Sequence, residues 1–408
     1  MHAVVFHAVG DIRLDNVAEP VIQERTDAIV RLTASAICGT DLHMVRGTMP
    51  GMKSGTILGH EGVGIVEDVG REVTSVKVGD RVVIPSTIAC GKCSYCQTGY
   101  YSQCDNANPN GKQAGTAFFG GPSTTGPFQG LQAEFARVPL ADAGLVKLPE
   151  NVSDDQAILL SDIFPTGYFA ADIAEIKPGD SVAVFGCGPV GLFCIASALL
   201  MKAGKVFAID ALPDRLAAAE RLGAEAIDFY KADPVDTIRS QTQGIGALRV
   251  IDAVGVDAYA PEEGWISSWL PSSERARHRE QVAEVAPTTR PKGPNWVPGD
   301  APSQVLDWAL EVIAKAGTFS IVGVYPQTAQ FFNIGAAMNK NITIQTGNCP
   351  HRKYLPRLVE MVHTEQIDPL AVIPARHEPL TDVLQAYKEF DKRKTGWIKV
   401  ELELPVTT

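Results

Sequence analysis

The stretch SVAVFGCGPVG, residues 181–191, decides the fold of the middle of this 408-residue chain. It begins with a short, mostly apolar run of the kind that forms a buried strand. Glycines then follow in the pattern G-x-G-x-x-G, at Gly186, Gly188 and Gly191. Gly186 permits a tight turn, Gly188 lets the backbone approach a pyrophosphate, and Gly191 lets a helix pack closely on the strand. The pattern alone is a weak signal, but a strand before it and a helix after it strengthen it.

The residues after this turn alternate between helix and strand patterns. PVGLFCIASALLMKAG predicts a helix that ends at Gly204, KVFAID a strand, and LPDRLAAAERLG a second helix that stops at Gly223. Further on, residues 302–317 predict a helix, and residues 318–325 and 341–348 predict strands. Such alternation predicts a doubly wound parallel sheet with right-handed crossovers.

Asp210 ends the strand after the glycine motif, about 20 residues further on. A carboxylate there accepts hydrogen bonds from a ribose 2′-hydroxyl and repels a 2′-phosphate, which favours NAD over NADP. Pro189 and Val190 open the helix, whose N-terminus offers N–H groups and partial positive charge to phosphates. Arg215 either flanks the adenine or is a solvated helix residue. The alternative for the whole motif is a glycine-rich turn that binds no nucleotide.

The first 150 residues are rich in short alternating runs, among them residues 27–38, 62–70 and 80–85, which predict strands of a β-rich domain. The chain is long enough for two domains. WIKVELE, residues 397–403, is expected to return to this first domain.

The net charge of −11 argues against a general affinity for nucleic acid or anionic membranes. No apolar run approaches the roughly 20 residues of a membrane helix, and the start of the chain reads as a strand, without a targeting pattern. Eight cysteines without an export signal indicate a reducing compartment. We therefore expect a cytoplasmic protein that acts on a small molecule.

A tight cluster of four cysteines, Cys90, Cys93, Cys96 and Cys104, predicts a structural metal site. Four thiolates close a tetrahedron around Zn²⁺ and leave no open position. The first three have ferredoxin-like spacing, but the fourth does not fit an iron–sulfur motif. Disulfides would require an exported protein. Zinc is therefore the favoured interpretation.

Cys38, His60 and Asp162 are candidate ligands of a second metal that keeps an open position. Asp162 lies between apolar segments, where a cation would stabilise its charge; the alternative is an aspartate that caps a helix. Three protein ligands and a water make a catalytic zinc, which beside a nicotinamide serves hydride transfer. Thr40 and His43 could pass a proton outward.

Residues 256–302 interrupt the alternation of strands and helices with a proline-dense insertion. Its tryptophans favour an ordered loop, which either covers its own core or covers a ligand. The insertion carries Trp265, Trp269, Trp296, Arg275, Arg277, His278 and Arg279.

The motifs ICGTDLH, GHEGVG, the four-cysteine lobe and GCGPVG, in this order, resemble the zinc-dependent medium-chain alcohol dehydrogenase family. SDIFPTGY and the insertion are similar to its formaldehyde-dehydrogenase-like subgroup. The resemblance implies an α/β protein with a GroES-like β-rich catalytic domain and a Rossmann domain with a doubly wound parallel sheet. We assign residues 1–160 and 350–408, with the zinc lobe at about 90–104, to the first domain, and residues 161–349 with the insertion to the second.

The resemblance also implies roles for single residues. Cys38, His60 and Asp162 would hold the catalytic zinc, although many members have a cysteine or glutamate where this chain has Asp162. Glu61 would lie beside the metal, and Thr166 would lie near the nicotinamide. The proton relay would consist of Thr40 and His43.

The expected function is a zinc-dependent alcohol dehydrogenase that transfers hydride between an alcohol and NAD. It would hold two Zn²⁺ per chain and NAD, and act as a homodimer or homotetramer. The alternative is a formaldehyde or aldehyde dismutase whose NAD stays bound. A different class is a zinc-stabilised binding or regulatory protein without catalysis. Phe118, Phe119 and Phe128 either line the pocket or belong to the core.

Overall fold

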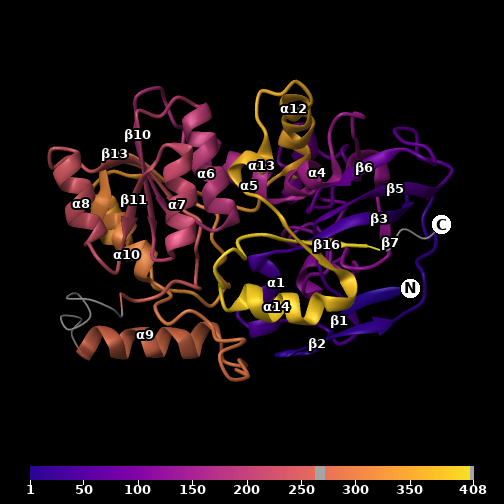
Figure 1. Ribbon diagram of the computed structural model, residues 1–408, viewed down its shortest axis with the longest axis horizontal. Helices are drawn as coiled ribbons and strands as arrows, with labels where there is room; N and C mark the ends of the chain where they lie inside the picture. The colour runs from indigo at the N-terminus through magenta and orange to yellow at the C-terminus, as the bar shows by residue number, and fades with distance from the viewer. Residues whose placement is uncertain (262–271, 405–408) are drawn as a thin grey trace. The chain divides into compact units, whose positions relative to one another are not determined.

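The computed structural model describes residues 1–261 and 272–404 and divides into two compact units (Figure 1). The first unit contains Met1–Pro165, Arg290–Trp296 and Asn348–Thr408, and the second contains Thr166–Thr289 and Val297–Gly347. Within the described residues, no helix combines the length and the apolar character needed to cross a membrane.

The second unit is built on a six-stranded parallel sheet, which confirms the predicted doubly wound architecture. The strand order is β11-β10-β9-β12-β13-β14, so the chain reverses direction across the sheet between β9 and β12. The strands are β9 (Ser181–Phe185), β10 (Lys205–Asp210), β11 (Glu225–Asp228), β12 (Ala247–Asp252), β13 (Ile313–Ile321) and β14 (Thr343–Thr346).

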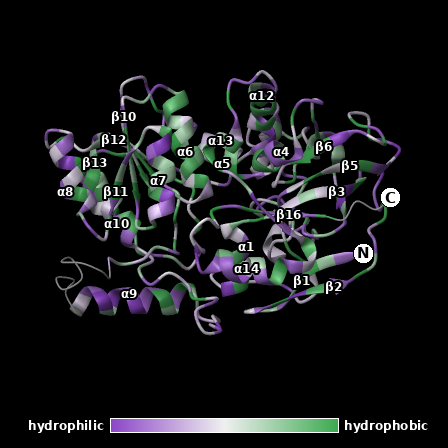
Figure 2. Cartoon of the chain, viewed as in Figure 1, coloured by the Kyte–Doolittle hydropathy of each residue, from purple (hydrophilic) through white to green (hydrophobic). Residues whose placement is uncertain are grey.

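Four helices cover the parallel sheet: α6 (Pro189–Leu200), α7 (Pro213–Leu222), α8 (Pro234–Gln241) and α10 (Gln304–Val312). Figure 1 shows α6 and α7 on one face and α8 and α10 on the other. Figure 2 shows hydrophobic residues along α6 and the sheet strands, and residues 191–198 of α6 are buried. Gly223 ends α7 at φ +100°, a left-handed conformation that glycine adopts without strain.

The predicted helix at residues 302–317 is only partly correct. α10 ends at Val312, and Ile313 already pairs with Ala247 on β12. The pairing then shifts register, and Ala316 has φ +58°, so the strand contains an irregularity of the bulge type. Strand pairing within the sheet therefore overrides the helical pattern of the sequence.

The insertion is ordered where the structure describes it. It forms α9 (Ser272–Val285), on which Arg277 donates to Asp307 at 2.9 Å. The side chain of Trp296 is buried in the core of the first unit, since Arg290–Trp296 belongs to that unit. Trp265 and Trp269 lie outside the described residues.

The first unit contains a seven-stranded sheet, ordered β15-β16-β3-β5-β6-β8 with β7 also pairing with β3, and a small sheet ordered β2-β1-β4. Because β16 pairs antiparallel with β3, the segment after residue 396 returns to the N-terminal part of the chain. The strands are β1 (His2–Ala8), β2 (Asp11–Asn16), β3 (Ala28–Ile37), β4 (Thr56–Ile57), β5 (Gly62–Val69), β6 (Arg81–Ile84), β7 (Phe135–Val138), β8 (Val146–Lys147), β15 (Arg376–Pro379) and β16 (Val400–Glu403).

The helices of the first unit place most of the candidate metal ligands at their ends. Cys38 precedes α1 (Gly39–Arg46), and Asp162 follows α4 (Asp154–Ser161), directly before α5 (Ile163–Ile173), which belongs to the second unit from Thr166 onward. The remaining helices are α2 (Ser94–Gln97), α3 (Ala141–Gly144), α12 (His351–His363), α13 (Pro369–Val372) and α14 (Val383–Asp391).

A buried ion pair ties three distant segments of the first unit together. Arg46 on α1 lies 2.7 Å from Asp391 on α14, and the two side chains are 2% and 1% exposed. The other carboxylate oxygen accepts from the Trp296 backbone N–H at 2.7 Å and from Asn295 Nδ2 at 3.0 Å. Asp391 therefore compensates the buried charge of Arg46 and also satisfies a backbone donor.

We expect Asp391→Ala to destabilise the first unit by about 3–5 kcal/mol, because it leaves the Arg46 charge buried and unpaired. Asp11→Ala is the control, since Asp11 pairs with the 57% exposed Arg13 at 2.8 Å, and water screens such an exposed pair so that it adds little to stability. Thermal and urea unfolding of both variants measures the difference. Equal stability of the two variants would contradict the role given to Asp391.

Candidate active site

Three predicted metal ligands come together in the first unit. Cys38 Sγ lies 3.7 Å from Asp162 Oδ2, and His60 Nε2 lies 3.4 Å from the same oxygen. Around a tetrahedral zinc, sulfur–oxygen and nitrogen–oxygen ligand pairs are separated by about 3.6 and 3.4 Å. The donor atoms of these residues and of Glu61 all lie within 4.8 Å of one another, and all four residues are buried. This donor set fits zinc.

Local structure brings each ligand to this point. Cys38 lies directly between β3 and α1. Its backbone N–H donates to Asp41 Oδ2 at 2.9 Å, and this hydrogen bond fixes the start of α1. The backbone at Asp162 departs from helical geometry, with φ −141° and ψ −64°, between α4 and α5. The N-cap of α4 is Ser153, and the carboxylate of Asp162 faces histidine side chains.

Asp41 supports His60 from the side opposite the donor cluster. Its Oδ1 lies 3.4 Å from His60 Nδ1, and both atoms are buried without a hydrogen-bond partner among the described residues. Burial lowers the pKa of His60, but the charges of Asp41 and Cys38 outweigh it and raise that pKa well above its usual value. A carboxylate beyond the second ring nitrogen is the usual support of a metal-binding histidine.

Glu61 is held by Lys399, a residue that the sequence analysis did not single out. Lys399 Nζ lies 2.5 and 2.6 Å from the two carboxylate oxygens and 3.3 Å from the Ile37 carbonyl. Burial raises the pKa of Glu61, and the Lys399 charge works against that rise. The pair gives the buried carboxylate a counter-charge directly beside the donor cluster.

His351 is the second residue that the sequence analysis missed. Its Nε2 lies 2.7 Å from Asp162 Oδ1, and its Nδ1 lies 3.1 Å from Thr87 Oγ1. Burial raises the pKa of Asp162, but hydrogen bonds from His351 and His60 outweigh it and hold that pKa well below the usual value. Asp162 thus directs one oxygen toward the metal ligands and the other toward His351.

The predicted proton relay lies on α1. Thr40 and His43 are three residues apart on this helix and therefore share a face. His43 is buried, and its Nδ1 lies 2.8 Å from Thr48 Oγ1, which orients the ring.

The three phenylalanines differ in their surroundings. The ring of Phe118 meets His60 edge-on, with centroids 6.3 Å apart, so it lies beside the metal ligands. Phe119 is a core residue that is 1% exposed, and Phe128 is partly buried against the same core.

The four-cysteine lobe has the geometry of a second metal site. Cys93 Sγ lies 3.5 Å from Cys96 Sγ and 3.9 Å from Cys104 Sγ, close to the roughly 3.8 Å between sulfurs in a zinc tetrathiolate. All eight cysteines of the chain are free thiols. Burial raises the pKa of Cys90, but N–H donors from Lys92, Asn106 and Cys93 outweigh it and lower that pKa to about 6. The thiolate form that zinc requires is therefore favoured at Cys90.

The glycine motif forms the turn between β9 and α6 in the second unit. Gly186 has φ +88°, and a side chain at Gly191 would begin 1.8 Å from the Gly186 carbonyl oxygen. α6 begins at Pro189, followed by Val190, and the guanidinium of Arg215 lies beside Gly188.

Asp210 lies at the end of β10, where its Oδ2 accepts from the Cys187 backbone N–H at 2.8 Å. Its Oδ1 accepts from Ala211 and Leu212 at 2.7 and 2.9 Å. The carboxylate is thereby fixed beside the glycine turn. Thr166 also belongs to this unit and lies in α5.

Comparison with known proteins defines the family. The family model for the alcohol dehydrogenase GroES-like domain matches residues 24–150, and the model for zinc-binding dehydrogenase matches residues 189–262. The chain is 35% identical to the zinc-type alcohol dehydrogenase-like protein AdhB of Bacillus subtilis, over 99% of this chain and 100% of AdhB. The chain belongs to the zinc-type alcohol dehydrogenase family, which confirms the resemblance seen in the sequence.

Two further proteins are similar over nearly the whole chain. A glutathione-independent formaldehyde dehydrogenase of Pseudomonas aeruginosa is 32% identical over 95% of this chain and 94% of its own length. Among solved structures, the alcohol dehydrogenase TADH from Thermus sp. ATN1 has a TM-score of 0.79 and 32% identity, and the match covers 99% of this chain and 100% of TADH.

Asp162→Ala should remove one metal from the protein and leave the other, because it deletes the oxygen that Cys38 and His60 face. Cys93→Ser is the reciprocal variant and should lose only the metal of the cysteine lobe. Metal content per chain, measured by mass spectrometry after dialysis, reports both. Unchanged metal content in the Asp162 variant would refute the ligand set.

His351→Ala should weaken metal binding at the Asp162 site by about 10–100-fold, because Asp162 loses the partner that orients it. His351→Gln keeps a donor and should retain most of the affinity. Cobalt titration of protein whose cysteine lobe is already filled with zinc, followed through the absorption of the cobalt–thiolate bond at Cys38, separates a change at the metal from a loss of fold. Wild-type affinity and spectrum in the alanine variant would contradict this role.

Proposed function

We propose that the protein oxidises a small alcohol, or reduces the matching aldehyde or ketone, with NAD as the hydride carrier. One observation carries the proposal: Cys38, His60 and Asp162, far apart in the chain, present their donor atoms to one point with the separations of zinc ligands. Three protein ligands, as opposed to four thiolates, are the pattern of a catalytic site.

The residues around the metal ligands fix a single arrangement of donors. A zinc ion held there supplies a Lewis acid for an alcohol or carbonyl oxygen. Asp162 offers Oδ2 because His351 binds Oδ1, and His60 offers Nε2 because Nδ1 faces Asp41. The Phe118 ring lies edge-on to His60 and places an apolar surface beside the candidate metal ligands.

Thr40 and His43 are the groups that we assign to proton transfer. The oxidation of an alcohol releases its hydroxyl proton, which a neighbouring hydroxyl and imidazole can accept in turn. The 2.8 Å contact between His43 Nδ1 and Thr48 Oγ1 holds the imidazole in one orientation for this task.

The turn around Gly186 and Gly188 is the proposed site for NAD, which accepts the hydride during alcohol oxidation. The start of α6 offers N–H groups to the pyrophosphate. Asp210 uses three hydrogen-bonding positions on backbone N–H groups, and a carboxylate has about four. The remaining position suits a ribose hydroxyl, and the charge disfavours a 2′-phosphate.

Steady-state turnover of short, branched and aromatic alcohols with NAD⁺ and with NADP⁺ tests the proposal. We expect activity with NAD⁺, and we expect Asp210→Ser to reduce the ratio of kcat/KM for NAD⁺ to that for NADP⁺ by about tenfold or more. Asp214→Ser, on the following helix α7, is a control for a lost charge nearby. No turnover by zinc-replete protein, or an unchanged ratio in the Asp210 variant, would overturn the proposal.

A second candidate is an aldehyde dismutase that retains its NAD. The identity to a glutathione-independent formaldehyde dehydrogenase and the insertion with α9 favour it. One sample of purified protein is denatured by heat, and the NAD released into the supernatant is measured. This measurement, read beside the turnover assay on a second sample, distinguishes retained NAD from exchanging NAD. Released NAD near one per chain supports retention, and its absence leaves the exchanging dehydrogenase.

A further inference from the structure

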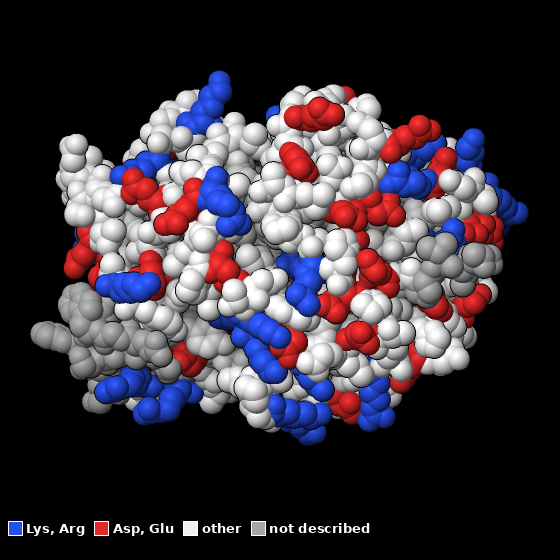
Figure 3. Space-filling model, viewed as in Figure 1, with Lys and Arg blue, Asp and Glu red and all other residues white. Residues whose placement is uncertain are grey.

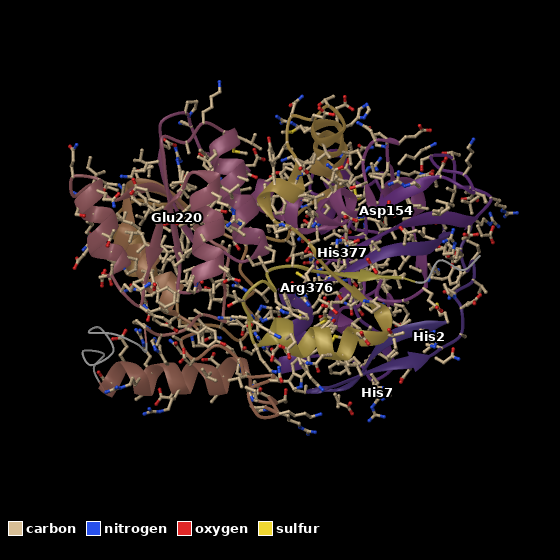
Figure 4. All side chains as sticks on the ribbon, in the orientation of Figure 1. His2, His7, Asp154, Glu220, Arg376 and His377 are labelled. Atoms are coloured by element: carbon tan, nitrogen blue, oxygen red, sulfur yellow. The ribbon has the colours of Figure 1, made fainter. Side chains whose placement is uncertain are left out.

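Three potential metal-binding side chains gather on the seven-stranded sheet, outside the two sites described above. Asp155 lies in the first turn of α4, His377 on β15 and Glu401 on β16, and their donor atoms lie within 4.8 Å of one another. His377 and Glu401 are direct partners in the parallel pairing of β15 with β16, so their side chains leave the sheet on one face. Figure 4 labels His377 and Asp154, the neighbour of Asp155.

Glu401 is the member of this cluster that points to a ligand. Its side chain is only 4% exposed, and its Oε2 has no hydrogen-bond partner within residues 1–261 and 272–404. This oxygen lies 3.9 Å from His377 Nδ1, so it faces the cluster. A buried carboxylate oxygen without a partner is unfavourable unless a cation or a proton compensates its charge.

Negative charge dominates the surroundings of His377. Its ring faces Asp155 at 3.7 Å, Glu401 at 3.9 Å and Glu403 at 3.6 Å. Burial, and then the charges of Asp155, Asp154 and Glu403, raise the pKa of Glu401 to about 8. One imidazole cannot neutralise three carboxylates.

Two basic side chains near the cluster are engaged by other groups. Lys399 binds both oxygens of Glu61. Arg81 donates to Asp154 at 2.6 Å and to the Val152 carbonyl at 2.8 Å. Figure 3 shows that acidic and basic side chains are interspersed on the visible face of the molecule. In an ordinary surface ion pair each carboxylate has its own cation. In this cluster Asp155, Glu401 and Glu403 share the single imidazole of His377.

We propose that Asp155, His377 and Glu401 bind a divalent transition cation such as Zn²⁺ at a third metal site. One imidazole nitrogen and two carboxylate oxygens are ligands that zinc accepts at about 2.0–2.2 Å, which places them about 3.4 Å apart. Asp155 faces His377 Nε2 at 3.7 Å, and Glu401 faces Nδ1 at 3.9 Å, so each carboxylate lies beside a different ring nitrogen. With one donor atom taken from each residue, all three atoms lie within 4.8 Å of one another, and rotation of the half-exposed Asp155 and His377 side chains brings them to the separation of zinc ligands. The site is independent of the proposed catalytic function, since it shares no ligand with the Asp162 site.

Zinc titration of protein already loaded at its other sites tests this proposal. After equilibrium dialysis at neutral pH, wild-type protein should bind one additional Zn²⁺ per chain, counted by mass spectrometry. His377→Ala and Glu401→Gln should each weaken this additional binding by about tenfold or more, and keep the other metals. Glu401→Gln keeps the shape of the side chain and removes its charge, so a loss of zinc binding in this variant is not explained by misfolding.

The control variant is His7→Ala, labelled in Figure 4, because His7 is similarly half-exposed but pairs with one carboxylate, Asp15, at 2.7 Å. It should bind the additional Zn²⁺ as the wild type does. Absence of an additional equivalent up to about 1 mM Zn²⁺ would overturn the proposal. An additional equivalent that persists in both His377→Ala and Glu401→Gln would also overturn it, since the ion would then bind elsewhere.

Discussion

The buried carboxylate of Asp162 is the constraint on which the candidate active site depends. One oxygen faces Cys38 and His60, from the N-terminal part of the chain, and the other lies 2.7 Å from His351, nearly two hundred residues later. A buried charge is stable only when such partners surround it. The same requirement fixes the rotamer of the aspartate, and so the point at which the three predicted metal ligands meet. The backbone break between α4 and α5 is the local feature that frees this side chain from the helix.

Buried charges elsewhere in the first unit follow the same rule and connect segments far apart in the chain. Lys399 neutralises Glu61 beside the predicted metal ligands, and Arg46 on α1 neutralises Asp391 on α14. The Asp41 carboxylate accepts a hydrogen bond from the Cys38 backbone N–H with one oxygen and faces His60 Nδ1 with the other. Glu401 Oε2 is among the buried side-chain atoms of the described residues that have no hydrogen-bond partner, as are Asp41 Oδ1 and His60 Nδ1.

The sequence predicts best what is encoded locally. The glycine turn, its flanking strand and helix, and the cysteine lobe each lie within a few tens of residues, where spacing limits the geometry. His351 and Lys399 escaped prediction because a lone histidine or lysine in sequence carries no sign of the carboxylate that it meets in the fold. The helix predicted at 302–317 failed at Ile313 because pairing with β12, a long-range contact, decided its conformation.

The antiparallel pairing of β16 with β3 also bears on the order in which the protein folds. The segment that carries the counter-charge for Glu61 is synthesised after the entire second unit, so the first unit has its large sheet incomplete for most of translation. The second unit, whose sheet needs no strand from beyond residue 347, can form while the first still waits. Assembly from long-range contacts of this kind is slow. A nascent chain therefore leaves Ala34–Ile37 of β3 without the pairing that β16 later provides, and this part of the edge, beyond the part paired with β7, is the place where mispairing with another chain would begin.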